Sequence, residues 1–542
     1  MKTAKDILKT LRQQQIKLVL NGDDIEVISY DNKLSKDQIL LIKSNKEGII
    51  EYLKTINNKI VVSEIPNVPL AKNYPLSNSQ RRLWVVSQME ESSIAYNLPV
   101  SIVLDGNYDI PCFIRSIEAT IDRHEILRTV FKEDTNGEVS QWVLDRESLG
   151  FSIDYKDFST ISNPTETSKK YVVEDSYKIF DLADGPLIRA SIHKLSDEQY
   201  VFYYNMHHII SDGWSMNVLA KDVMAYYDAY ISETEPNVSD LRIQYKDYAA
   251  WELDQLEGEL FDTHKSYWLD KLSGELPVID LPGQKSRPKF KGNRGETIQT
   301  FVSPKLTNGL NAFVKGQGGS LFTGILTILN TLFYRYTSKG DIIIGSPMVG
   351  RDHLDLQDQI GFYVNSLAFR NEVNLEDSFV SLYKNVNATV IKGFDHKLYP
   401  FDRLVEDLGV PYDMSRTPIF DISLTLHDPI DGEGVQLPSL EDMDNVSPVT
   451  AGVSKNDVEF HFRQIGEVLS FGINYNSDVY DAETLANVMS HFKQLLSSML
   501  MNPEKAISTI DYLRTEEKQE LLNDFNANTL EYSENTTLLS LL

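Results

Sequence analysis

The chain has little cysteine, no excess of positive charge and no long apolar run. One cysteine, Cys112, among 542 residues excludes an internal disulfide bond and fits a reducing compartment. A formal net charge of −27 argues against nucleic acid or an anionic membrane as the main partner, because both attract basic surfaces. No run of about 18 apolar residues occurs, and the first residues lack the apolar segment of a signal peptide. We therefore expect a cytoplasmic protein without a transmembrane helix.

A chain of 542 residues with 42% hydrophobic residues is long enough for several domains. The first predicted domain is small. Residues 1–58 show helical spacing, then two β-rich runs around Asn21-Gly22, then two more helical stretches, which predicts an α-β-β-α-α unit. Residues 1–60 hold 11 Lys and Arg against 8 Asp and Glu, a net charge of +3, so that −30 remains for the rest. The proline-containing residues 59–73 are predicted to be an extended linker.

The long remainder alternates β-rich runs with amphipathic helices, which predicts an α/β (α+β) fold. No proline- or glycine-rich break separates its parts, and it is large for one core. We therefore expect two tightly packed lobes, residues 74–252 and residues 253–515. The polar residues 516–542 are predicted to be a linker and the start of a truncated following domain.

Two adjacent histidines stand out in "MHHIISDGWS", residues 206–215, because the whole chain has only 10. The run up to His208 is β-rich, so His207 and His208 are expected on opposite faces of a sheet, where they cannot bind one metal. No GxSxG elbow supports a hydrolase triad. One buried and one solvated histidine without a function remains an alternative.

The residues that follow the pair favour a catalytic histidine. Asp212 or Ser215 is placed as the N-cap of a helix, and apolar residues at helical spacing follow. A histidine at the end of a strand, before a tight turn at Gly213 and a helix, is held firmly at the edge of a cleft. A plain helix cap is the alternative interpretation of Asp212.

The segment His207–Gly213 resembles the HHxxxDG signature of condensation domains of nonribosomal peptide synthetases, which are relatives of chloramphenicol acetyltransferase. Six further stretches resemble the family's other motifs in their usual order: SNSQRRLW (77–84), RHEILRTVF (123–131), YKDYAAW (245–251), IGFYVNSL (360–367), HKLYPFD (396–402) and YDMSRTPIF (412–420). Tyr412 and Thr417 depart from the usual residues of the last motif. Residues 1–58 resemble the tubulysin-synthetase-type docking domains that begin some synthetase subunits.

The resemblance implies a fold of two chloramphenicol-acetyltransferase-like lobes in a V-shaped pseudo-dimer, with a tunnel between them. The implied reaction joins a peptidyl or aminoacyl thioester on an upstream carrier protein to the amine of a downstream aminoacyl-carrier thioester. Both substrates would arrive on the 4'-phosphopantetheine arms of the partner carriers, and no cofactor or metal would be bound by the chain itself. An adenylation domain would follow in the full-length chain.

The forms of the motifs favour the subtype that joins an L-configured donor to an L-configured acceptor. Both histidines are present, which argues against a heterocyclisation domain, and the RLW and IGFYVN stretches argue against an epimerisation domain. A starter domain that takes an acyl donor, a non-catalytic recruiting platform and a protein-interaction adaptor remain the alternatives.

The resemblance also assigns roles to residues. His208 would position the attacking amine and take its proton, and the backbone N–H of Gly213 would support the oxyanion. His207, Asp212 and Arg351 would support the site, with Asp212 paired to Arg351. The residues expected in the substrate tunnel are Ser211, Trp214 and Asn365.

Three lysines, Lys17, Lys33 and Lys36, belong to the basic unit at residues 1–58. A hairpin offers an unpaired strand edge to which an extended peptide can add. We expect these lysines to favour the acidic C-terminal tail of an upstream synthetase subunit.

Overall fold

The computed structural model describes residues 16–21, 24–29, 36–50, 64–88, 93–256, 258–411, 413–430, 447–527 and 539. It separates into two compact units, Met1–Asn67 and Val68–Leu542, so that the division falls inside the predicted linker. No helix in these ranges is long and apolar enough to cross a membrane.

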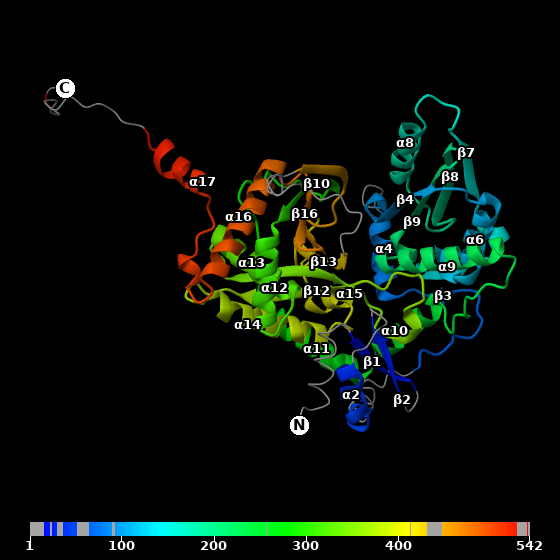
Figure 1. Cartoon of the computed structure of the whole chain (residues 1–542), viewed down its shortest axis with the longest axis horizontal. Coiled ribbons are helices and arrows are strands. Elements are labelled where there is room, and N and C mark those ends of the chain that lie inside the picture. The colour runs from blue at the N-terminus through cyan, green and yellow to red at the C-terminus, as the bar shows by residue number, and fades with distance from the viewer. Residues whose placement is uncertain are drawn as a thin grey trace. The chain divides into compact units, whose positions relative to one another are not determined.

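The first unit contains a β-hairpin and a helix (Figure 1). Strands β1 (Ile16–Asn21) and β2 (Asp24–Ser29) are antiparallel, and the last pair of their ladder is Asn21 with Asp24. Helix α2 (Lys36–Ser44) follows, and residues 46–50 are again helical. Ile42 and Ile49 are buried, as expected for an apolar helix face. The predicted first helix and the end of the predicted third helix lie outside the described residues.

The first lobe of the second unit is built on two small sheets. A four-stranded sheet has the order β4-β9-β8-β7, and a three-stranded sheet has the order β3-β6-β5. The strands are β3 (Tyr74–Pro75), β4 (Asn97–Asp105), β5 (Thr129–Glu133), β6 (Val139–Val143), β7 (Ile153–Asp157), β8 (Ile188–Ser196) and β9 (Gln199–His207). The helices are α4 (Asn78–Ser87), η1 (Ile94–Tyr96), α6 (Ile110–Arg123), η2 (Glu125–Arg128), α7 (Arg146–Leu149), α8 (Pro164–Ser176), η3 (His208–Ile210), α9 (Gly213–Ile231) and α10 (Tyr245–Gln255).

The four-stranded sheet carries helices on both faces because neighbouring residues of β9 point in opposite directions. Phe202 contacts Phe113 of α6, with 5.2 Å between ring centroids, and Phe113 contacts Tyr227 of α9 at 5.7 Å. Tyr203, the next residue of β9, lies 6.4 Å from Tyr171 of α8 between ring centroids. Helices α6 and α9 therefore cover one face, and α8 covers the other.

The second lobe is built on a mixed seven-stranded sheet of order β12-β11-β13-β15-β16-β10-β14. The strands are β10 (Arg294–Val302), β11 (Asp341–Met348), β12 (Asn365–Glu372), β13 (Ile422–Ile430), β14 (Ser447–Val453), β15 (Val458–Ile465) and β16 (Val468–Asn476). The helices are α11 (Glu259–Lys271), α12 (Pro304–Gly316), α13 (Leu321–Thr337), η4 (Leu354–Leu356), α14 (Phe379–Asp395), α15 (Phe401–Leu408), α16 (Ala482–Met501), η5 (Ile507–Thr509), α17 (Thr515–Gln519) and η6 (Glu520–Asp524).

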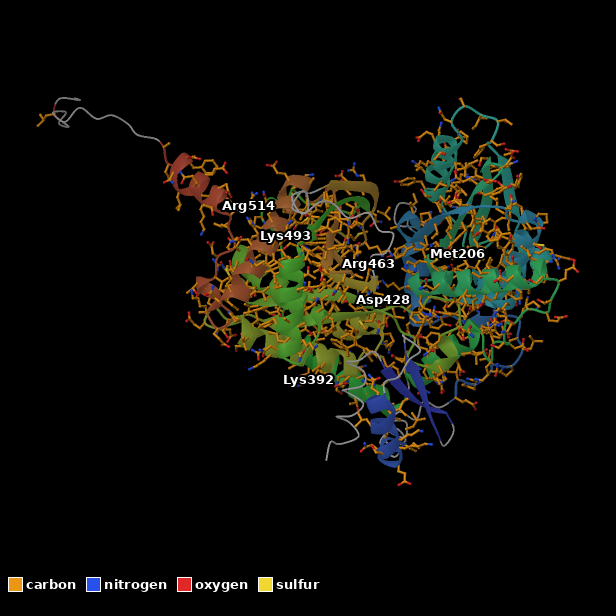
Figure 2. All side chains as sticks on the ribbon, viewed as in Figure 1. Met206, Lys392, Asp428, Arg463, Lys493 and Arg514 are labelled. Atoms are coloured by element: carbon orange, nitrogen blue, oxygen red, sulfur yellow. The ribbon has the colours of Figure 1, made fainter. Side chains whose placement is uncertain are left out.

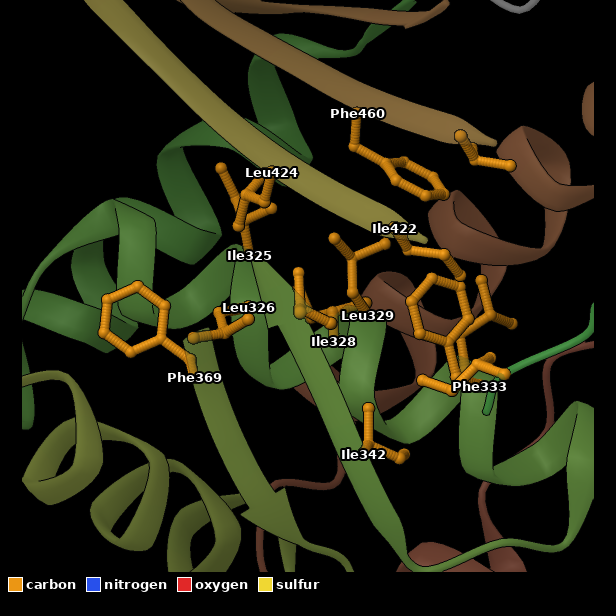
Figure 3. Packing of buried hydrophobic residues seen from close by; sticks show 14 of the residues in the cluster. Ile325, Leu326, Ile328, Leu329, Phe333, Ile342, Phe369, Ile422, Leu424 and Phe460 are labelled. Carbon is orange, nitrogen blue, oxygen red and sulfur yellow. The ribbon is translucent and has the colours of Figure 1, made fainter. Parts of the chain in front are cut away.

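Helix α13 lies at the centre of this lobe's core and is apolar almost all round, as expected for a helix that packs on every side. Figure 3 shows Ile325 of this helix beside Leu424 of β13, and Leu326 beside Phe369 of β12. The seven-stranded sheet thus rests on a helix buried beneath it.

Candidate active site

The histidine pair lies at the end of β9, a central strand of the first lobe. Figure 2 labels Met206, the residue immediately before the pair. The strand ends at His207, and His208 begins the short helix η3. The prediction that both residues lie in one strand is therefore wrong for His208, because the chain turns to enter α9. His207 is fully buried, whereas His208 is half-buried.

His207 stabilises the turn into η3 through a side-chain hydrogen bond. Its Nδ1 accepts a hydrogen bond from the backbone N–H of Ile209 at 3.2 Å, so the proton of the neutral ring belongs on Nε2, which lies 3.3 Å from Ser87 Oγ. Burial, followed by the positive charge of Lys455, lowers the pKa of His207 to about 3. The ring is therefore a neutral part of the scaffold.

His208 has the opposite arrangement of protons. Its Nδ1 lies 2.7 Å from the carbonyl oxygen of Ser211, and because a carbonyl only accepts, Nδ1 must donate and Nε2 keeps its lone pair. Burial, followed by the charge of Lys455, lowers the pKa of His208 well below its usual value. Phe362 packs edge-on against the ring at 4.8 Å between centroids. His208 is thus a neutral imidazole, and its Nε2 has no hydrogen-bond partner among the described residues.

Asp212 is the N-cap of α9. One carboxylate oxygen, Oδ1, accepts from the backbone N–H of Ser215 at 2.9 Å and from its hydroxyl at 2.7 Å. The other, Oδ2, accepts from the backbone N–H of Tyr363, which belongs to the second lobe, at 3.1 Å. Both oxygens are occupied, so Asp212 fixes the turn.

Arg351 completes this network from the second lobe. Its Nη2 donates to Asp212 Oδ1 at 2.9 Å, with the two side chains 2% and 1% exposed, so the predicted pair is present. Its Nη1 donates to the carbonyl oxygens of Leu356 and Gln359, each at 2.6 Å. A buried, hydrogen-bonded ion pair therefore joins the turn after His208 to the second lobe.

Gly213 is the first residue of α9 and is exposed. A Cβ added to Gly213 would meet no atom within 4 Å. Its backbone N–H is at the positive end of the α9 dipole, where a developing negative charge is stabilised. The space beside Gly213 is therefore open to a substrate.

The three predicted tunnel residues differ in their surroundings. Ser211 is buried, and its hydroxyl has no partner among the described residues. Trp214 is 40% exposed, and its Nε1 donates across the lobes to the carbonyl oxygen of Gln357 at 2.8 Å. Asn365 is half-buried and uses its amide on the main chain: it donates to Lys397 O and Tyr399 O, each at 2.8 Å. The geometry of Asn365 is that of a residue that holds the segment before α15.

The predicted docking lysines are only partly described. Lys17 is in β1 and Lys36 is the first residue of α2, but their side chains and the whole of Lys33 lie outside the described residues. In the described part of the chain no group of three metal-ligating side chains is positioned to hold an ion.

Two further contacts at the lobe junction were not predicted. Arg82 of α4 pairs with Asp402 of α15 at 3.3 Å. The Lys455 ammonium lies 5.1 Å from the ring centroid of Tyr96. Arg82 and Asp402 were visible only as members of motifs, while Tyr96 and Lys455 stand in stretches without a distinctive pattern.

His208 thus lies as a neutral histidine at the junction of two α/β lobes, beside the exposed first residue of α9. The condensation-domain family matches residues 70–522, and the chain therefore belongs to this family. In nonribosomal peptide synthetases such domains catalyse peptide-bond formation.

Two curated relatives are synthases that are much longer than this chain. Tyrocidine synthase 3 of Brevibacillus parabrevis is 32% identical over 512 residues, which cover 94% of this chain and 8% of that protein. Gramicidin S synthase 2 of Brevibacillus brevis is 30% identical over 497 residues, which cover 91% of this chain and 11% of that protein. The chain thus spans a small part of the relatives that it matches.

Solved structures confirm the predicted fold class. The X-domain from teicoplanin biosynthesis has a TM-score of 0.72 at 24% identity, over 83% of this chain and 100% of that chain. The starter condensation domain of rhizomide synthetase has a TM-score of 0.66 at 19% identity, over 82% of this chain and 98% of that chain. The second unit therefore has the mixed α/β fold of condensation domains.

Proposed function

We propose that this chain joins an upstream peptidyl or aminoacyl thioester to the amine of a downstream aminoacyl thioester, with both substrates carried on phosphopantetheine arms. Membership of the condensation-domain family supports the reaction class. The observation that carries the proposal is the tautomer of His208, whose Nδ1–H is held by the Ser211 carbonyl so that Nε2 is left to accept a proton.

The proposed mechanism needs only a weak base. An α-amine has a pKa of about 7.7–8.0, so part of it is already neutral at cellular pH. The amine attacks the thioester carbonyl carbon, and His208 Nε2 accepts the amine proton as the C–N bond forms. The C–S bond then breaks, and the thiol of the donor arm leaves with a proton returned from His208. The backbone N–H of Gly213 stabilises the carbonyl oxygen while it carries negative charge.

Holding the two thioesters together supplies a large part of the catalysis. Fixing two reactants in a productive orientation contributes about 7–11 kcal/mol in favourable cases. Arg351 and Asp212 support this proposal. Their buried ion pair joins the turn after His208 to the second lobe, and so holds the two sides of the site at a fixed distance.

The direct test is His208→Ala in the complete chain. Incubated with donor and acceptor carrier proteins of the same biosynthetic system, the wild type should form dipeptidyl-carrier, seen by intact-mass measurement. His208→Ala should lose at least about 10²-fold in rate because general base catalysis contributes about 10²–10⁴-fold. His193→Ala, which alters a buried histidine of the neighbouring strand β8, is the control and should retain turnover. Near-native turnover by His208→Ala would refute the assignment.

The motif forms lead us to propose an L-configured donor. L-aminoacyl, D-aminoacyl and fatty-acyl donor carriers offered in parallel test whether the donor site prefers an L-residue, a D-residue or the acyl group of a starter domain. Consumption of the fatty-acyl donor alone would make the chain a starter domain, and consumption of none would make it a recruiting platform.

We also propose that residues 1–58 recruit the acidic C-terminal tail of an upstream subunit and so raise the local concentration of its carrier. The net charge of +3 in residues 1–60 supports this role. The complete chain should bind such a tail peptide with a dissociation constant of about micromolar order, more weakly as salt screens the charges. A charge-reversed peptide and a Lys17→Glu/Lys36→Glu variant should bind less. Equal binding of the acidic peptide and its charge-reversed copy would exclude an electrostatic contribution to docking.

A further inference from the structure

Lys455 approaches the histidine pair from the second lobe. It lies between β14 and β15, and its backbone N–H donates to Glu459 Oε1 at 2.8 Å, which fixes the loop. Its ammonium lies 5.1 Å from the ring centroid of Tyr96 in the first lobe. The Tyr96 ring is itself 6.4 Å from the ring of His207 and 6.4 Å from that of His208, between centroids. One aromatic ring thus contacts both the histidine pair and the ammonium.

The nearby carboxylate does not form a direct ion pair with this ammonium. Glu459 uses Oε1 to accept the backbone N–H groups of Lys455 and Asn456, at 2.8 and 2.9 Å, and Oε2 to accept from Asn474 Nδ2 at 2.9 Å. No carboxylate of the described residues lies within ion-pair distance of Lys455 Nζ. The half-buried ammonium therefore has an aromatic face on one side and no anion in contact with it.

Two other cations of the lobe junction are already paired with carboxylates. Arg351 is paired with Asp212 at 2.9 Å, and Arg82 is paired with Asp402 at 3.3 Å. Lys455, by contrast, has no carboxylate within ion-pair distance among the described residues, so its charge remains available for a ligand.

The pKa of His208 also responds to the charge of Lys455. After burial, the charge of Lys455 is the next largest cause that lowers the pKa of His208, and His207 on β9 has a smaller effect in the same direction. Burial lowers the pKa of Lys455 itself, while Glu459, whose pKa is lowered to about 2, opposes that change. Burial raises the pKa of Tyr96 on η1, so this phenol stays neutral. A cation at this position therefore favours the unprotonated, base-competent form of His208.

We propose that the Lys455 ammonium is a further catalytic group, which contacts the thioester carbonyl oxygen and stabilises its negative charge during amine attack. As the C–N bond forms, the carbonyl π pair moves onto the oxygen beside the ammonium, and it returns when the C–S bond breaks. No proton moves to or from Lys455 in either step, so no other reactant is needed. This inference rests on the condensation reaction proposed above.

The test compares Lys455→Met, Lys455→Gln and Lys455→Arg in the complete chain, with Lys392→Met as a matched control. Lys392 is an exposed lysine of α14 (Figure 2) and reports on the loss of one positive charge alone. Dipeptidyl-carrier formation is followed by intact mass, with alanyl-carriers as donor and acceptor at saturating and subsaturating concentrations and across pH. Circular dichroism selects the folded variants.

Lys455→Met and Lys455→Gln should lower kcat by about 10²-fold, as the loss of an oxyanion donor does, with little change in KM. Lys455→Arg should recover most of the rate because it keeps the charge. In the neutral variants the acidic limb of the rate profile should move to higher pH, because the charge that opposes protonation of His208 is gone. Lys392→Met should match the wild type in kcat and in the pH dependence of the rate.

Unchanged kcat and pH profile in the neutral variants would overturn the proposal, as would a rise in KM alone, which would assign Lys455 to carrier binding. A wild-type chain that forms no product with any carrier pair would instead refute the proposed function on which this inference rests.

Discussion

Replacing Arg351 by methionine tests the network that joins the two lobes. The substitution keeps an unbranched apolar side chain, shorter than arginine, and removes the guanidinium, so that Asp212, whose side chain is 1% exposed, is left buried. The carboxylate would keep its hydrogen bonds from Ser215 and Tyr363 but would lose its counter-charge.

Arg351→Met should lower the free energy of unfolding substantially. Removing one partner of a buried ion pair costs about 3–5 kcal/mol, since the other charge is left uncompensated. Asp212→Asn should cost less, because Arg351 would still donate to the carbonyl oxygens of Leu356 and Gln359. The double variant leaves neither charge alone, so its loss should be smaller than the sum of the single losses by at least about 1–2 kcal/mol.

The assay is urea unfolding of the complete chain, followed by tryptophan fluorescence, together with the condensation rate of the native variants. Both single variants should lose stability and rate together, because Asp212 caps the helix that presents Gly213. Additivity of the two losses within about 0.5 kcal/mol would refute the coupling. Full activity in a destabilised Arg351→Met would show that the network serves folding alone.

Two other predictions follow from the same turn. Gly213→Ala should leave the free energy of unfolding unchanged or raise it by up to about 1 kcal/mol, since a Cβ there meets no atom within 4 Å and alanine is the better helix former. Its condensation rate should nevertheless fall, because the added Cβ would take space that we assign to the substrate. Native turnover would show that no substrate atom occupies this space, since alanine keeps the backbone N–H. His207 is buried with its pKa lowered to about 3, so the unfolded chain takes up a proton that the folded chain does not. Its contribution to stability should therefore be complete above about pH 6.5 and be lost at about 1.4 kcal/mol per unit as the pH falls from 6.5 toward 3. In urea unfolding at several pH values, His207→Gln should show a shallower loss, and an unchanged slope would contradict this reasoning.

The sequence by itself determined the family and the local pieces of the site. The HHxxxDG segment, its six companion motifs, the strand that ends at His207 and the helix that follows Asp212 can all be recognised along the chain. Such features depend on residues a few positions apart, which the patterns of strands, caps and helices record directly. The pairing of Asp212 with Arg351 was predictable only through the family resemblance, because the two residues are 139 positions apart.

Only the tertiary structure decided the chemical state of the site. The tautomer of His208 follows from the position of the Ser211 carbonyl, and the place where β9 ends follows from the turn into α9. The contact of Lys455 with Tyr96 joins two unremarkable stretches from different lobes. Burial, pKa and hydrogen-bond partners depend on which distant segments pack together, and local sequence patterns carry no direct record of those contacts.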